Sequence, residues 1–135
     1  MLEIEAISKS FGGVKAVNAV GFYVAAGSIH GLIGPNGAGK TTMINLISGF
    51  LTPDSGRIVL DGREIQRLSP DARARLGVAR TFQNLRLFRN LSVRRNIELA
   101  EGSVPQDRDP GLIGDAIDRF GLDGVLDDAP GSLSY

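Results

Sequence analysis

The feature that most limits the fold of this chain is an eight-residue run, Gly34-Pro35-Asn36-Gly37-Ala38-Gly39-Lys40-Thr41. The run fits the pattern G-x-x-x-x-G-K-[ST] at every defined position. Its glycines let the backbone curl so that successive N–H groups point inward, which is the geometry that binds phosphate oxygens. The pattern therefore predicts a phosphate-binding loop between a strand and a helix.

The sequence on each side of the loop fits that context. Residues 29–33 are a short apolar run that predicts a strand, in which His30 is expected to be packed rather than catalytic. Lys40 to Ser48 has helical spacing, with an apolar face of Met43, Ile44 and Ile47. The alternative, a glycine-rich turn without a ligand, is disfavoured because both flanking elements are predicted.

Each part of the loop has an expected role. Backbone N–H groups and the positive end of the following helix bind phosphate, and Lys40 supplies a mobile cation to the β and γ phosphates. The Thr41 hydroxyl is placed to bind magnesium, while Asn36 and Thr42 are further candidates for phosphate contact. The predicted nucleotide-binding residues here are Gly34, Asn36, Gly37, Ala38, Gly39, Lys40, Thr41 and Thr42.

The rest of the chain predicts a mixture of strands and helices. Strands are expected at 2–7, 14–24, 57–60 and 78–82, and helices at 70–76, 93–100 and 112–120. Ser69 and Ser92 are expected to cap the first two of these helices. Tight turns are expected at Gly12-Gly13 and Asp61-Gly62, and a surface loop at 102–110. This pattern predicts an α/β fold.

Composition excludes several classes of function. Fifteen basic residues balance fifteen acidic ones, so the chain has no surplus of charge for neutralising a nucleic-acid backbone. It has no cysteine, which excludes disulfides, thiolate metal sites and cysteine nucleophiles. No apolar run approaches the ~18 residues that a membrane span needs, so we expect contact with a membrane only through a partner.

The residues from Gly31 to Thr42 are similar to the Walker A region of ATP-binding cassette (ABC) transporter ATPases. Lys9-Ser10-Phe11-Gly12-Gly13 resembles the family's adenine-stacking segment, which implies that Phe11 lies against the base. Stacking a base on an aromatic ring contributes about 1 to 3 kcal/mol without hydrogen bonds. The resemblance thus implies ATP and Mg²⁺ as the ligands.

A second segment, 80–84, resembles the Q-loop of the same family. By that likeness Gln83 contacts magnesium and the attacking water, which makes it both a metal ligand and a catalytic residue. Its side-chain amide suits this role because its oxygen accepts from water or binds the metal. The apolar residues from Arg80 to Leu91 resemble the region that borders the groove for the membrane subunit's coupling helix.

The resemblance implies a P-loop NTPase fold of the ABC type, truncated, with an N-terminal antiparallel β region. About 1–82 corresponds to the nucleotide-binding core and β region, and about 83–135 to the Q-loop and an incomplete helical subdomain. Leu133-Ser134-Tyr135 resembles the start of the signature motif, and no Walker B motif follows. Asp61 is no substitute, because Gly62 follows it where a catalytic glutamate is needed. We therefore expect negligible ATP turnover, no faster than that of a Lys40→Ala control, and loss of packing partners for Leu32, Ile33, Ile44 and Ile47.

Within the family, residues 11–13, 48–50 and 80–88 together look most like the ATPase subunits of bacterial branched-chain amino-acid importers. Urea importers and lipopolysaccharide exporters share parts of the pattern. Arg95 departs from it, because these proteins usually carry glutamate there. The resemblance implies membrane permease subunits and a second ATPase subunit as partners, at the cytoplasmic face of the bacterial inner membrane.

Two other readings remain open at this point. One is a different P-loop protein, a GTPase or a nucleotide kinase; the chain has no N-K-x-D guanine-reading segment, and thirty-three residues precede its loop. The other is a soluble ABC protein that acts on nucleic acid through Arg80, Arg86, Arg89, Arg94 and Arg95. In a chain without net charge such arginines more often form a solvated or partner-facing surface.

Overall fold

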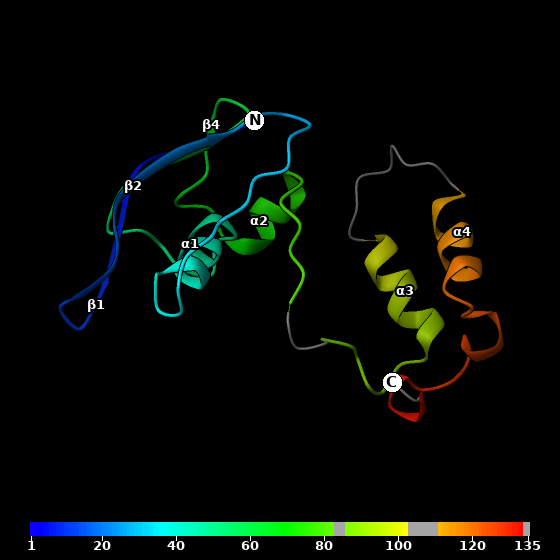
Figure 1. The fold of residues 1–135 in the computed structure, drawn as a ribbon. Coiled ribbons are helices and arrows are strands. Elements are labelled where there is room, and N and C mark those ends of the chain that lie inside the picture. Colours follow the sequence, from blue (N-terminus) through cyan, green and yellow to red (C-terminus); the bar gives the residue numbers. More distant parts are fainter. Residues whose placement is uncertain (83–85, 103–110, 134–135) are drawn as a thin grey trace. The chain divides into compact units, whose positions relative to one another are not determined.

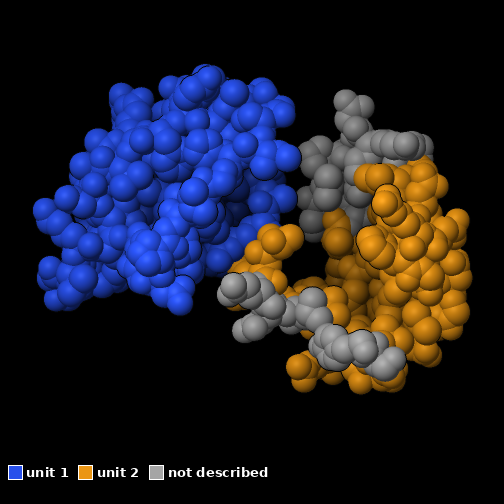
Figure 2. All heavy atoms as spheres, viewed as in Figure 1, with its two compact units in different colours: residues 1–80 blue, residues 81–135 orange. Residues whose placement is uncertain are grey.

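The computed structural model describes residues 1–82, 86–102 and 111–133. The chain divides into two compact units, unit 1 from Met1 to Arg80 and unit 2 from Thr81 to Tyr135 (Figures 1 and 2). Unit 1 contains the β sheet and the glycine loop, and unit 2 is helical.

Unit 1 is built on a four-stranded antiparallel sheet with the strand order β2-β1-β3-β4. The strands are β1 (Leu2–Phe11), β2 (Val14–Val24), β3 (Ser55–Leu60) and β4 (Arg63–Glu64). Gly12 and Gly13 link β1 to β2 with φ angles of 51° and 86°, and Asp61 and Gly62 link β3 to β4 with 48° and 79°. Both tight turns and the antiparallel β region are therefore as predicted, because each two-residue connection needs left-handed backbone at both positions.

Two helices complete unit 1, α1 (Lys40–Ile47) and α2 (Pro70–Arg75). The core contains Ile4, Ile7, Val17, Met43, Leu46, Ile58 and Ile65. Met43 and Leu46 are the buried residues of α1, whereas Ile44 is 40% exposed, so the predicted apolar face was partly wrong. The predicted start of α2 is confirmed, since the Ser69 hydroxyl accepts a hydrogen bond from the Ala72 N–H at 3.2 Å.

Two predicted strands, at 29–33 and 78–82, are absent from the described residues. Residues 29–33 and 78–82 form no regular secondary structure. A strand requires a hydrogen-bonded neighbour, and neither segment pairs with any strand of the described sheet. The Ile29 and Ile33 side chains are 102% and 94% exposed. His30 is exposed too and stacks on Phe22 with a centroid separation of 5.4 Å, so its predicted packing inside a strand was wrong.

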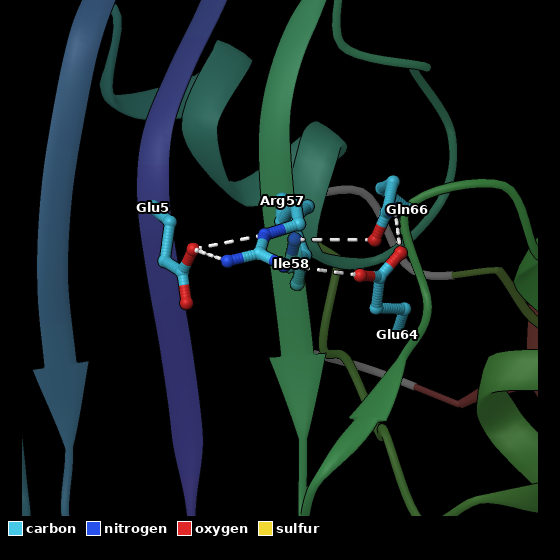
Figure 3. A network of polar contacts seen from close by, with 5 residues as sticks. All are labelled: Glu5, Arg57, Ile58, Glu64 and Gln66. Atoms are coloured by element: carbon cyan, nitrogen blue, oxygen red, sulfur yellow. Dashed lines mark hydrogen bonds and ion pairs between the residues drawn. The ribbon is translucent and has the colours of Figure 1, made fainter.

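Polar contacts cross three strands of the sheet at Arg57 (Figure 3). Its guanidinium donates two hydrogen bonds to the Glu5 carboxylate on β1, at 2.9 and 2.6 Å, and lies 3.5 Å from Glu64 on β4. These two carboxylates, Glu5 first, raise the pKa of Arg57. Gln66 extends the network by accepting from the Ile58 N–H and donating to Glu64. The ion pairs are exposed and weak individually, but they match the register of β1, β3 and β4.

Unit 2 contains helices α3 (Val93–Gly102) and α4 (Leu112–Arg119), followed by two short 3₁₀ turns, η1 (Asp123–Val125) and η2 (Pro130–Ser132). Ser92 caps α3 as predicted, accepting from the Arg95 N–H at 3.3 Å. The Val93 and Arg94 N–H groups donate to the carbonyls of Asp128 and Leu126. The predicted loop at 102–110 lies almost wholly outside the described residues. Among the helices that the structure describes, none combines the length and apolar character of a membrane span.

Candidate functional site

The glycine loop leads directly into α1 and leaves the start of that helix uncapped by side chains. Gly37 and Gly39 take left-handed backbone, with φ angles of 84° and 83°, and the Ala38 N–H closes a turn on the Pro35 carbonyl at 3.2 Å. Gly39 is the N-cap residue and has no side chain to bond the first-turn N–H groups. No acidic residue occurs in the first turn of α1. The helix start therefore presents N–H donors and a positive dipole end that suit an anion.

Lys40 folds back over this loop. Its ammonium donates to the carbonyls of Gly34 and Pro35, both at 2.7 Å. The side chain is half-buried. Two backbone carbonyls thus hold a full positive charge beside the glycines, where it adds to the field of the helix start.

The loop is fixed to the sheet at Gly39. A Cβ atom built on this residue would lie 2.3 Å from the Ala16 carbonyl oxygen of β2 and 3.5 Å from a methyl group of Val17. Only glycine permits this close approach, and the positive φ independently favours it. The contact seats the loop on β2, whose Val17 pairs with Lys9 of β1.

Phe11 ends β1 at the hairpin that joins it to β2. Its side chain is 46% exposed, and the Lys9 ammonium lies 5.8 Å from its ring centroid. Asp54 accepts from the Lys9 ammonium at 2.7 Å and from the Ser10 N–H at 2.8 Å. Those two contacts, that of Lys9 first, lower the pKa of Asp54. The aromatic face is thus presented to solvent from a strand end that Asp54 fixes.

Three further predicted site residues lie in the loop or in the first turn of α1. Asn36 lies in the turn of the loop and is exposed; Thr41 is exposed in the first turn of α1, and Thr42 is half-buried there. Gln83 lies outside the described residues. The structure therefore brings the loop residues together at the start of α1, in the same unit as Phe11.

Sequence reasoning missed two arginine contacts at the other end of α1. The Arg73 side chain is buried and donates to four backbone carbonyls, two of them in the last turn of α1. Burial lowers the pKa of Arg73. Arg80 donates to the side chains of Asn45 and Ser48. One signal was available, because Arg73 stands three residues before Leu76 on a face where an apolar residue is expected.

Four of the five arginines proposed for nucleic-acid binding have other partners. Arg80 contacts α1, Arg94 pairs with Asp127 at 3.2 Å, and Arg95 pairs with Glu98 at 2.8 Å. Arg86 lies over the Phe82 ring, 4.2 Å from its centroid. Side chains that already make such contacts do not form a continuous basic surface for a phosphate backbone, and the nucleic-acid reading is disfavoured.

Two apolar residues beside Arg86 are exposed: Leu87 is 47% exposed and Phe88 is 60% exposed.

This chain aligns over most of its length with curated relatives, but it covers less than half of each relative's own length. The chain is 46% identical over 101 residues to the high-affinity branched-chain amino acid transport ATP-binding protein BraF of Pseudomonas aeruginosa, covering 75% of the chain and 40% of the relative. It is 43% identical over 101 residues to LivG of Escherichia coli K12, a protein of the same description, with the same coverage. It is 45% identical over 101 residues to the ribose import ATP-binding protein RbsA 1 of Mesorhizobium japonicum, covering 75% and 20%.

Solved structures give the same result for the fold. The ADP conformation of MJ1267, an ATP-binding cassette of an ABC transporter, matches with a TM-score of 0.77 and 31% identity, covering 99% of this chain and 59% of that one. A nucleotide-free cassette matches with a TM-score of 0.77, 30% identity and the same coverage. The chain thus spans about three fifths of these cassettes, a truncated form of their α/β fold. The family model described as ABC transporter matches residues 17–135, and the chain belongs to this family of transport ATPases.

Proposed function

We propose that this chain is the ATP-binding part of an ABC importer subunit, and that Gly34 to Thr41 bind the phosphates of MgATP. The observation that carries the proposal is the arrangement of the loop, with Lys40 held over it and the start of α1 uncapped. The solved relative whose ADP conformation is known has 31% identity to this chain and supports a nucleotide as the ligand.

The residues fit a nucleotide with magnesium. Lys40 has a third N–H donor beyond the two that bond carbonyls, and the loop N–H groups complement phosphate oxygens. The exposed Thr41 hydroxyl would hold Mg²⁺, with Gln83 proposed as a further ligand. Bound Mg²⁺ neutralises charge on the β and γ phosphates. Our proposal for this chain is MgATP binding with negligible hydrolysis, because Gly62 follows Asp61 at the position where a catalytic glutamate is needed.

Removing the Lys40 ammonium tests the phosphate site. The Lys40→Ala variant is expected to bind MgATP about tenfold to a hundredfold more weakly, because a charge-assisted contact to phosphate is lost. Isothermal titration of the 135-residue chain at low temperature measures this. Lys15→Ala is the matched control, since Lys15 is exposed on β2 and is no part of the loop. Equal affinity in the Lys40 and Lys15 variants, or no binding by the parent chain, would refute the proposal.

Phe11 is proposed to stack on the adenine ring. Phe11→Ala should weaken ATP binding by about 1 to 3 kcal/mol while leaving binding of inorganic tripolyphosphate unchanged, because only ATP carries a base. Titrating both ligands separates a base contact from a general loss of structure. Val14→Ala, at the residue that pairs with Phe11 and is 69% exposed, serves as the control. Equal losses for both ligands would remove Phe11 from the site.

The proposed cargo is a branched-chain amino acid, with membrane permease subunits and a second ATPase subunit as partners at the cytoplasmic face of the inner membrane. BraF and LivG support this cargo, whereas RbsA 1 has a similar identity and carries the name of a ribose importer. Urea import and lipopolysaccharide export are further alternatives. The exposed Leu87 and Phe88 are the proposed anchors for the permease, since helix-in-groove contacts use such side chains.

Binding to purified permease subunits tests whether this chain belongs to a branched-chain amino acid importer or to a ribose importer. The chain should bind the detergent-solubilised permease of a branched-chain amino acid importer more tightly than that of a ribose importer, and Phe88→Asp should abolish the difference. Leu112→Asp is the control, because Leu112 is a similarly exposed apolar residue of α4. Tighter binding to the ribose permease would overturn the cargo assignment without affecting the nucleotide site.

A further inference from the structure

We infer that Arg73 and Arg80 form a clamp on the C-terminal end of α1 that positions the phosphate-binding residues at its N-terminal end. Neither arginine belongs to the loop, so both would be positioning residues. The inference rests on the proposed function, because it assigns them a role in nucleotide binding at that site.

Arg73 provides the buried part of the clamp. Its Nη1 donates to the Leu46 and Ile47 carbonyls at 2.5 and 2.7 Å, which are carbonyls of the last turn of α1. Its Nη2 and Nε donate to the Gln66 and Leu68 carbonyls at 3.0 and 3.1 Å. No carboxylate is among these partners. The planar guanidinium therefore ties the end of α1 to the segment that leads into α2.

Arg80 provides the second part. Its Nη1 donates to the Asn45 side-chain oxygen at 2.6 Å and to the Ser48 hydroxyl at 3.1 Å, and its guanidinium lies 5.4 Å from the Phe50 ring centroid. The Ser48 hydroxyl in turn donates to the Ile44 carbonyl at 2.6 Å. Arg80 thus contacts the side chains of the same helix end whose backbone Arg73 contacts.

The clamp lies opposite a tight contact at the start of the helix. Gly39 packs against the Ala16 carbonyl so closely that it leaves no space for a Cβ. A helix of eight residues is about 12 Å long and moves as a rigid rod, so a contact at each end fixes its direction. If the C-terminal end is released, α1 pivots at Gly39, and Lys40 and Thr41 change direction relative to the loop.

Charge supports the same assignment. Cations stabilise the C-terminal end of a helix, yet α1 has no basic residue of its own in its last turn. Arg73 and Arg80 supply that charge from later in the sequence. The phosphates are proposed to bind at the opposite end, so both ends of α1 would have the charges that the helix dipole favours.

The test compares Arg80→Met with Arg75→Met by isothermal titration, using MgATP and magnesium tripolyphosphate as probes. Arg80→Met keeps an apolar side chain but removes the hydrogen bonds to Asn45 and Ser48. It is expected to weaken the binding of both probes about tenfold, which is the effect of losing one charge-assisted contact. Arg75→Met is the control, because Arg75 is an exposed residue of α2 paired with Asp71. Arg73→Lys should give an intermediate loss of affinity. If this variant does not fold, the result for Arg80→Met decides the test.

The titration separates positioning from folding. Partial unfolding lowers the number of binding sites per chain, whereas displaced phosphate ligands raise the Kd at an unchanged number of sites. A raised Kd for both probes in Arg80→Met but not in Arg75→Met supports the clamp. An Arg80→Met Kd within about twofold of that of Arg75→Met overturns it, since twofold is well below the effect of one such contact. If the parent chain binds neither probe, the proposed function fails first and the inference fails with it.

Discussion

Replacing Arg73 by methionine is expected to lower the free energy of unfolding of unit 1 by about 3 kcal/mol or more, because four carbonyls, one buried and three partly buried, lose their donor together. The four acceptors are the carbonyls of Leu46, Ile47, Gln66 and Leu68. Methionine fills part of the volume, so little of the loss comes from a cavity. Against the typical stability of a small domain, about 5 to 15 kcal/mol, such a loss is large.

Urea denaturation followed by circular dichroism measures this change. The control is Arg75→Met, which removes an arginine two positions along the same helix with an exposed ion pair to Asp71 and should shift stability by less than about 0.5 kcal/mol. A loss below about 1 kcal/mol for Arg73→Met would contradict the burial and the contacts described for Arg73.

Substituting alanine for Gly39 is expected to abolish most nucleotide affinity, weakening MgATP binding about a hundredfold. The added Cβ would lie 2.3 Å from the Ala16 carbonyl oxygen, and a φ of 83° is strained for any residue with a side chain. Because the neighbouring atom belongs to the backbone of β2, no side-chain rotation relieves the contact. The loop therefore has to leave the strand, and the N–H groups at the start of α1 move with it.

Gly31→Ala is the matched control for this substitution. Gly31 lies three residues before the loop, has no left-handed φ, and a Cβ built on it meets no atom within 4 Å. Titration with MgATP should therefore give the parent Kd for Gly31→Ala. Equal MgATP affinities of the Gly39 and Gly31 variants would show that the contact with Ala16 does not determine the binding conformation of the loop.

Local sequence signals predicted the features that local physics determines. The two-residue turns at Gly12-Gly13 and Asp61-Gly62 require left-handed backbone that glycine readily adopts, and Ser69 and Ser92 are helix caps whose hydroxyls act within three residues. The loop itself belongs to this class, because its glycines, Lys40 and the start of α1 are contiguous. Family resemblance supplied the fold and the family, both confirmed by the comparisons.

Contacts between distant residues were less predictable. The apolar runs at 29–33 and 78–82 have strand-like composition, yet a strand also needs a neighbour, and composition carries no information about one. Arg73 of α2 contacts Leu46 of α1, which is 27 positions earlier in the sequence, so its partners could not be read from local sequence signals. Gln83 and Phe11 stay predictions in their catalytic and base-stacking roles.

The most direct test of the central claim is the location of nucleotide binding, measured from backbone amide NMR shifts of the ¹⁵N-labelled chain during titration with MgATP. The account predicts saturable shifts concentrated at Gly37, Gly39, Lys40 and Thr41, with smaller ring-current shifts around Phe11. In Lys40→Ala the shifts at the loop should saturate only at an MgATP concentration about tenfold to a hundredfold higher. Saturable shifts that leave the loop amides unmoved, or no shifts at any ATP concentration in the folded chain, would contradict the assignment of Gly34 to Thr41 as a phosphate site.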